Sequence, residues 1–169
     1  MLSLTQILEE RKQVDPLFVI ELNISGRSLE SINVLQYFRN IEQLNISFNK
    51  LSSISPLKSL SNLRVLLADD NNISTLEPLS QLARLEILHI NGNPIQGRQE
   101  LEWLCPLGRL RKLSVMRVPS FEQDSTIYSF IITIFPQLEY LNEERIRNYS
   151  GELLDLDKFI NALPVIPSK

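Results

Sequence analysis

The sequence is poor in the residues that disulfides, metal sites and catalytic centres need. Its 169 residues include one cysteine, Cys105, and one histidine, His89. One cysteine cannot form an internal disulfide, and we expect Cys105 to be a small buried side chain. No cysteine, aspartate or second histidine flanks His89 at ligand spacing, so the sequence predicts no metal site.

Recognisable catalytic motifs are also missing. The sequence has no glycine-rich phosphate loop, no H-E-x-x-H pair and no nucleophile elbow. A dyad of Cys105 with His89 is geometrically poor, because His89 lies in a predicted strand and Cys105 in a return segment. We therefore expect no enzyme, no cofactor and no small-molecule substrate.

Two further shortages concern charge and apolar length. The formal net charge is −3 at pH 7, which leaves no electrostatic footprint for nucleic acid or an anionic membrane. No stretch approaches the ~20 apolar residues of a membrane span, and the first residues do not resemble a signal peptide. We expect an intracellular protein, nuclear or cytoplasmic or ciliary and not secreted. Its partner is expected to be another protein, with nucleic acid bound only indirectly.

What the sequence has is a repeat. Hydrophobic residues make up 43% of the chain, which is enough for a core. Segments starting at Val19, Ile41, Leu63 and Leu85 align at a spacing of 22 residues, and a longer repeat of 25 residues leads to Leu110. Apolar residues recur at repeat positions one, four, six and eleven. Position nine is asparagine in three copies, at Asn49, Asn71 and Asn93. Such self-similarity indicates a solenoid.

Each position of the repeat has a physical role. Positions three to seven predict a short strand whose alternate side chains face inward. The asparagine amides can satisfy backbone groups of the turn after each strand, as a structural ladder of Asn49, Asn71 and Asn93. Apolar positions fourteen, seventeen and twenty close the back of each coil, where Pro56 and Pro78 suit the start of a short helix. Because one coil cannot bury its own edge, the coils must stack with parallel strands on a concave face.

Both ends of such a stack need covers. A capping box from Ser3 to Gln6 predicts an N-terminal capping helix within residues 1–18. The solenoid with its C-terminal cap spans 19–146, ending in a helix, a proline stop and a final strand. Residues 147–169 form a C-terminal helix and tail, with the helix from about Ser150 to Leu163. That helix could complete the cap or dock on a partner, and both alternatives stay open.

The repeat resembles the SDS22-like class of leucine-rich-repeat proteins, in its 22-residue length and in the ending IYSFIITIFPQLEYLN. The resemblance covers about 19–146 and implies an α/β fold: a right-handed leucine-rich-repeat solenoid with parallel concave strands and helical caps at both ends. Three groups within the class are similar: spliceosomal A-prime proteins, acidic leucine-rich nuclear phosphoproteins, and ciliary repeat proteins of the axonemal dynein light-chain type. Arg27 replaces the first asparagine, and Ser129 stands where the cap usually has arginine.

The resemblance implies a non-catalytic protein-interaction module. The opening helix and the RVLLADDNNI repeat of this sequence favour one role within that class, an assembly subunit of a ribonucleoprotein similar to the spliceosomal A-prime protein. In that case the partner resembles an RNA-recognition-motif protein whose helix enters the groove. The alternative is a ciliary, axonemal or cytoskeletal adaptor.

The repeat register also locates a candidate binding surface. Val65, Leu67 and Ile87 are placed side by side and facing outward, although the fold needs no apolar residues there. Such a patch is typical of a binding site for a partner helix or surface. Asp69 and Asp70 are expected on one side of it, with Lys112 and Arg117 on the other, so that they orient the partner by charge. The complete predicted partner-binding set is Phe48, Val65, Leu67, Asp69, Asp70, Ile87, His89, Lys112, Met116, Arg117 and Tyr140.

Overall fold

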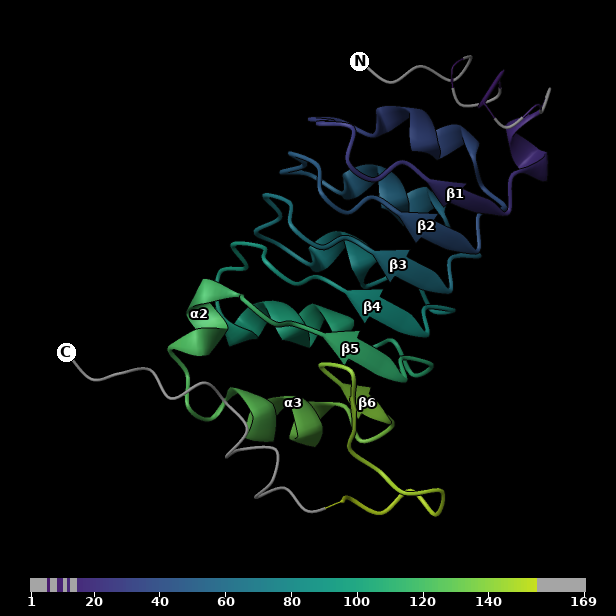
Figure 1. Cartoon of the computed structure of the whole chain (residues 1–169). Coiled ribbons are helices and arrows are strands. Elements are labelled where there is room, and N and C mark those ends of the chain that lie inside the picture. Colours follow the sequence, from purple (N-terminus) through teal and green to yellow (C-terminus); the bar gives the residue numbers. More distant parts are fainter. Residues whose placement is uncertain (1–5, 7–8, 11, 13–14, 155–169) are drawn as a thin grey trace.

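The computed structural model describes residues 6, 9–10, 12 and 15–154. Within residues 15–154, seven strands form one sheet in sequence order, with β1 to β6 parallel and β7 antiparallel to β6. The strands are β1 (Glu21–Asn23), β2 (Gln43–Asn45), β3 (Val65–Leu67), β4 (Ile87–His89), β5 (Lys112–Ser114), β6 (Tyr140–Leu141) and β7 (Glu144–Arg145). They stack as successive coils of a solenoid, from the N-terminal to the C-terminal end of the molecule (Figure 1).

The strand register follows the sequence repeat. Gln43 pairs with Val65, Val65 with Ile87, and Ile87 with Lys112, so equivalent repeat positions lie side by side. The 25-residue repeat keeps this register because its extra residues lie on the back, where the return helix has seven residues against three in the preceding coil. Burial confirms the predicted inward positions, since Leu44, Leu66 and Leu88 are at most 1% exposed. Of the positions predicted to face outward, Ser47, Asn91 and Ser114 are buried as well.

The backs of the coils are short 3-10 helices. They are η2 (Asn33–Tyr37), η3 (Ser55–Ser59), η4 (Glu77–Leu79) and η5 (Arg98–Leu104), whereas η1 (Pro16–Phe18) precedes β1. A 3-10 helix has three residues per turn, so side chains spaced by three share one face. Ile54, Leu57 and Leu60 have that spacing and are at most 1% exposed. The prolines predicted to begin return helices lie in the first turns of η3 and η4.

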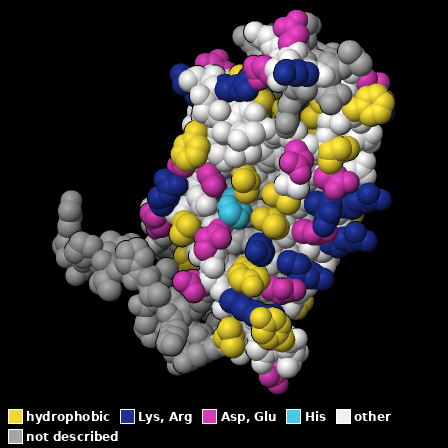
Figure 2. All heavy atoms as spheres, turned by 45° about the vertical axis from the view of Figure 1, so that its right-hand side comes forward, with side chains coloured by type: hydrophobic (Ala, Val, Ile, Leu, Met, Phe, Trp, Pro, Cys, Tyr) yellow, Lys and Arg dark blue, Asp and Glu magenta, His cyan; other side chains and the backbone are white. Residues whose placement is uncertain are grey.

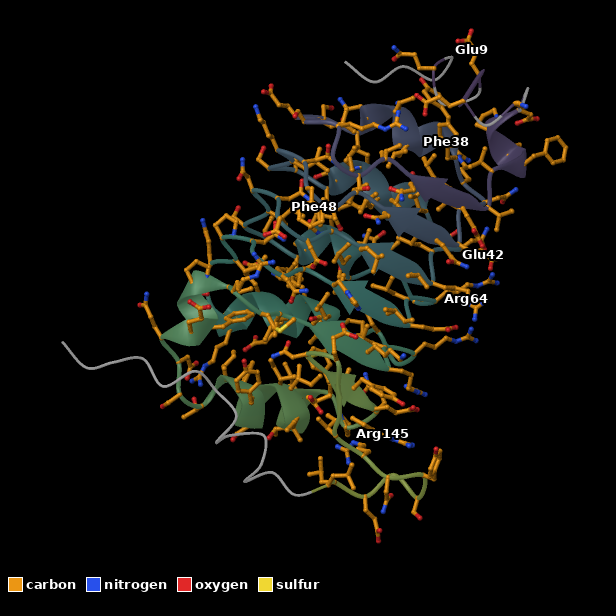
Figure 3. The ribbon with its side chains drawn as sticks, in the orientation of Figure 1. Glu9, Phe38, Glu42, Phe48, Arg64 and Arg145 are labelled. Carbon is orange, nitrogen blue, oxygen red and sulfur yellow. The ribbon has the colours of Figure 1, made fainter. Side chains whose placement is uncertain are left out.

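The core lies between the strands and the return helices. Each coil contributes position-four and position-six side chains, such as Leu44 with Ile46 and Leu66 with Ala68, and all four are nearly fully buried. Position two lies just before each strand and is charged from the second coil onward. There Arg64 forms ion pairs with Glu42 on one side (3.6 Å) and Glu86 on the other (3.0 Å). The side chains of Glu42 and Arg64 extend together in Figure 3.

The asparagine ladder is present. The Asn71 amide nitrogen donates to the carbonyls of Ile46 (3.0 Å) and Ala68 (3.3 Å), and its oxygen accepts from the Leu51 backbone N–H (3.1 Å). Asn49 and Asn93 make equivalent bonds one coil away. Each amide therefore joins two coils and satisfies carbonyls that are shielded from water.

The ends of the solenoid are covered differently. Gln6, Glu9 and Glu10 are helical, and Glu10 accepts two bonds from Arg27 at 2.8 and 2.6 Å. The helix predicted within residues 1–18 is described only in part: Lys12 lies in a turn and Pro16–Phe18 form a separate 3-10 helix, and residues 1–5, 7–8, 11 and 13–14 lie outside the described residues. At the other end, α2 (Pro119–Glu122) and α3 (Ile127–Ile134) precede β6. Buried Ile127 and Ile131 pack α3 against the last coils, as predicted for the terminal helix.

The segment after β7 differs from the sequence prediction. Residues 150–154 are a turn and a bridge, not the first turn of a helix, because Leu153 pairs with Arg147 and Leu154 donates to the Ile146 carbonyl. Arg147 also donates to the Leu138 carbonyl at 3.0 Å. Residues 147–154 thus continue the cap. The remainder of the helix predicted to reach Leu163 lies outside the described residues.

Cys105 was expected to be buried and is exposed. Leu101, Leu104, Leu107 and Leu110 take the buried positions at a spacing of three, which turns residue 105 outward. Partial burial and the nearby Glu102 raise the pKa of its thiol. Among the described helices, none is long and apolar enough to cross a membrane.

Candidate protein-binding surface

Val65, Leu67 and Ile87 lie on the outer face of the sheet. Leu66, between Val65 and Leu67, and Leu88, next to Ile87, point inward and are fully buried. The three outward side chains are partly exposed. Register pairs Val65 with Ile87 and Leu67 with His89, so these side chains adjoin across β3 and β4. Figure 2 shows hydrophobic side chains gathered around the histidine on this face. We define Val65, Leu67 and Ile87 as the apolar strip.

A second polar ladder runs along position seven, beside the apolar strip. In this ladder each side-chain oxygen accepts a hydrogen bond from the backbone N–H of the next coil. Ser47 Oγ accepts from Asp69 (3.1 Å), Asp69 Oδ1 accepts from Asn91 (2.8 Å), and Asn91 Oδ1 accepts from Met116 (2.6 Å). Sequence reasoning missed it, since serine, aspartate, asparagine and methionine do not look like one repeated position. Asp69 was predicted to bind the partner, yet one of its oxygens holds two coils together.

Position eight follows the ladder and has a left-handed backbone in every full coil. The values of φ are 67° at Gly26, 57° at Phe48, 51° at Asp70, 63° at Gly92 and 54° at Arg117. Glycine adopts this conformation without strain, and two glycines at one repeat position were the signal available in the sequence. Phe48 is 64% exposed at this turn, beyond the end of β2 (Figure 3).

The predicted charge arrangement needs correction. Asp70 and Arg117 do not stand apart on two sides of the strip, because they form a two-pronged ion pair at 2.8 and 3.0 Å. The pair passes over Gly92, where an added Cβ would lie 2.3 Å from Asp70 Oδ1. Hydrogen bonding to Asp70 raises the pKa of Arg117. The two side chains therefore compensate each other and close one border of the apolar strip.

His89 lies between two carboxylates. Its Nδ1 is 3.9 Å from Asp69 Oδ2, and its Nε2 is 3.3 Å from Glu143 Oε1. Glu143 and Asn142 form the tight turn between β6 and β7, both with positive φ. The hairpin tip therefore reaches back over β5 to β4, a contact that no sequence spacing predicts. Burial raises the pKa of Asp69, and the backbone hydrogen bond from Asn91 partly opposes that effect.

Tyr140 and Lys112 occupy the C-terminal end of the same face. Lys112 Nζ lies 4.5 Å from the centre of the Tyr140 ring. Arg145 Cζ lies 5.9 Å from that ring and 3.8 Å from the ring of Tyr149. Met116 is 41% exposed near the opposite border. The structure thus gathers the strip, His89, Lys112 and Tyr140 on one face, while Asp70 and Arg117 engage each other.

In the described part of the chain, the histidine, the cysteine and the acidic side chains are not all gathered at one place. Among the described residues, no group of three or more histidine, cysteine, aspartate or glutamate side chains could hold a metal ion. His89 and Cys105 belong to different faces, one on a strand and one at the end of a return helix. What the surface offers is apolar area with a polar border.

Known proteins share the repeat and the fold. A family described as leucine-rich repeats, in two copies, matches residues 61–104. No curated protein sequence matches the chain. A chain of the SNF/U2A' complex of Drosophila melanogaster is 25% identical, with a TM-score of 0.68 over 78% of this chain and 76% of that one. The fold is therefore a leucine-rich-repeat solenoid, whereas the narrower SDS22-like assignment stays a prediction.

Two bacterial structures have the same fold. Internalin C2 and the internalin inlF of Listeria monocytogenes are 22% and 20% identical, with TM-scores of 0.61 and 0.57. The alignments cover 73% and 80% of this chain but only 50% and 51% of theirs, so this chain spans about half their length. At such identity the likeness concerns the fold alone.

Proposed function

We propose that this leucine-rich-repeat solenoid is a non-catalytic interaction module that binds a helix or surface of another protein on its concave face. The apolar strip is the observation that carries the proposal. Its three side chains contribute nothing to the core, since the inward positions of β3 and β4 are already filled by buried leucines. Outward apolar residues in contact, with a polar border, are typical of a protein-binding site.

The strip suits a helix laid across the strands. Neighbouring strands are about 4.8 Å apart, and successive turns of a helix rise about 5.4 Å. One apolar side chain per turn can therefore face one strand each. Phe48 and Met116 stand exposed near the borders, where they can exclude water from the centre of such a contact.

For the biological setting we propose an assembly subunit of a nuclear ribonucleoprotein. The similarity to a chain of the SNF/U2A' complex supports this choice, because it extends over most of both chains. That structure is by its description a complex, which fits a module whose concave face accepts a protein. In this setting RNA is reached only together with the partner.

The test is a pull-down from the source cell with three baits, read by mass spectrometry. Leu67→Asp combined with Ile87→Asp should fold and lose the partner, by about 2 kcal/mol or more of binding free energy. Trp103→Asp is the control, since Trp103 is an apolar side chain that reaches solvent (47% exposed) but lies on the return helix η5. Circular dichroism melts verify that all three baits are folded.

The identity of the lost proteins separates the settings. Loss of spliceosomal RNA-binding proteins from the Leu67→Asp, Ile87→Asp bait supports the ribonucleoprotein role. Loss of motor or axonemal proteins instead would keep the site and move the protein to cilia. Recovery of the same proteins by all three baits would contradict the concave site.

A further inference from the structure

Four side chains form an alternating stack at the C-terminal end of the concave face. Lys112, Tyr140, Arg145 and Tyr149 follow one another, with each cation against a tyrosine ring. We define these four residues as the cation–tyrosine stack. Tyr149 is 96% exposed, and the ribbon places Arg145 at the lower end of the solenoid (Figure 3). The fold gives no reason for an ordered stack whose last ring is in solvent.

Among the described residues, neither cation of the stack is neutralised by a directly paired carboxylate. Arg145 does donate to the Arg147 carbonyl at 2.8 Å, and hydrogen bonding to Tyr149 raises its pKa, with a smaller contribution from the charge of Glu139. Of the ion pairs among described residues, none involves Lys112 or Arg145. Glu139, the carboxylate closest in sequence to Tyr140, is bound to Arg111 at 3.5 Å. Arg117, by contrast, is neutralised by Asp70. Two positive charges held against tyrosine rings, with no carboxylate paired directly to either, form a prepared site for an anion.

The stack continues the apolar strip. Position three of successive strands reads Val65, Ile87, Lys112 and Tyr140, each paired with the next, and Arg145 pairs with Tyr140 across the final hairpin. A helix bound over the strip thus meets the stack within the next one or two turns. Resting on the function proposed above, we propose that the cation–tyrosine stack binds acidic side chains on the same helix of the protein partner.

The spacing on that helix follows from the strand spacing. Three strand steps cover about 14 Å, which is close to three helical turns of about 5.4 Å, or about eleven residues. Apolar residues at i and i+4 would face Val65 and Ile87. Acidic residues at i+7 and i+11 would face Lys112 and the pair of Tyr140 with Arg145.

A protein carboxylate fits this place better than RNA. Glu139, Glu143 and Glu144 are exposed in or beside the same hairpin, and the whole chain carries a formal net charge of −3. Single carboxylates of a protein partner can reach the two cations without approaching these glutamates. A continuous RNA backbone would pass close to the glutamates and be repelled by them. Two unpaired cations are also few for a backbone of phosphates.

The experiment uses two blocked, alanine-rich helical peptides of about 20 residues. Both carry leucine at i and i+4; one has glutamate at i+7 and i+11, and the other has glutamine there. Fluorescence anisotropy gives the affinities, and methyl NMR signals of Val65, Leu67 and Ile87 report where the leucines bind. The proteins are the wild type, Lys112→Gln with Arg145→Gln, and the control Arg39→Gln with Lys50→Gln, two exposed cations outside the stack.

We expect the wild type and the control to bind the glutamate peptide about three- to tenfold more tightly than the glutamine peptide. The Lys112→Gln, Arg145→Gln protein should bind both peptides equally. Equal affinities in the wild type, or a preference retained without the two cations, would overturn the inference and leave the groove intact. If no strip methyl signal moves with either peptide, the proposed function itself fails.

A third probe tests the nucleic-acid alternative. A ten-nucleotide oligouridine is added to the wild type, and the ring signals of Tyr140 and Tyr149 are followed by NMR. We expect no shift at concentrations at which the glutamate peptide saturates. A shift that disappears in Lys112→Gln, Arg145→Gln would reassign the stack to RNA.

Discussion

At the scale of single residues, repeated amides hold the coils together. The side chain of Asn71 is nearly buried and bonds to backbone groups in two coils. Replacing it with alanine leaves those groups unsatisfied, so Asn71→Ala should lower the free energy of unfolding by about 1–3 kcal/mol. Urea denaturation measures the loss. Asn72→Ala, one residue away and exposed, is the control and should change little.

Asp69 gives stability a dependence on pH. Because burial raises its pKa, the folded protein disfavours the ionised carboxylate more than the unfolded chain does. Ionisation therefore costs stability as the pH rises through the ordinary range of aspartate, and the cost persists at neutral pH. Asp69→Asn keeps an oxygen that can accept from the Asn91 N–H. The variant should be more stable than the wild type at pH 7.

The same variant should lose its advantage in acid, where Asp69 is protonated in both states. Denaturant titrations at pH 7 and near pH 3 give the comparison, with Glu30→Gln, an exposed carboxylate, as control. A lower stability of Asp69→Asn at pH 7 would mean that the ionised form is needed by the ladder or by His89.

At the scale of elements, the sequence could predict much because the repeat encodes it. Strand register, inward leucines and the prolines of η3 and η4 all follow from spacing within 22 residues. The pairing of side chains from different coils does not follow from that spacing. The partners Asp70 and Arg117 are separated by 47 residues in the chain, and Glu143 meets His89 only because the hairpin turns back over the sheet. These contacts depend on which rotamers adjacent coils allow, which a repeat pattern does not contain.

The formation of the short 3-10 return helices depends on the stiffness of their backbone, to which proline contributes, more than on their length. Pro56 is the second residue of η3, where its fixed φ is already that of the helix. Pro56→Ala frees the unfolded chain and should destabilise the protein by about 0.5–1 kcal/mol. Thermal melts measure this change. Binding at the concave face should stay the same, since η3 lies on the back; altered binding would show that the two faces are coupled.

At the scale of the whole molecule, one face of the sheet serves stability and the other serves the proposed binding. The inward face, the asparagine ladder and the return helices stabilise the solenoid. The outward face runs from polar residues at β1 and β2, through the apolar strip, to the cation–tyrosine stack. Charge and hydropathy along one row can therefore select both the partner and its register, without any change in fold.

The central claim is that a protein occupies the apolar strip. The most direct measurement replaces Ile87 with a photo-crosslinking amino acid in cells and identifies the attached molecule by mass spectrometry, with Trp103 replaced in the same way as control. The account predicts a protein crosslinked from position 87, through an amphipathic segment, and not from position 103. No crosslink from position 87, or the same products from both positions, would contradict it.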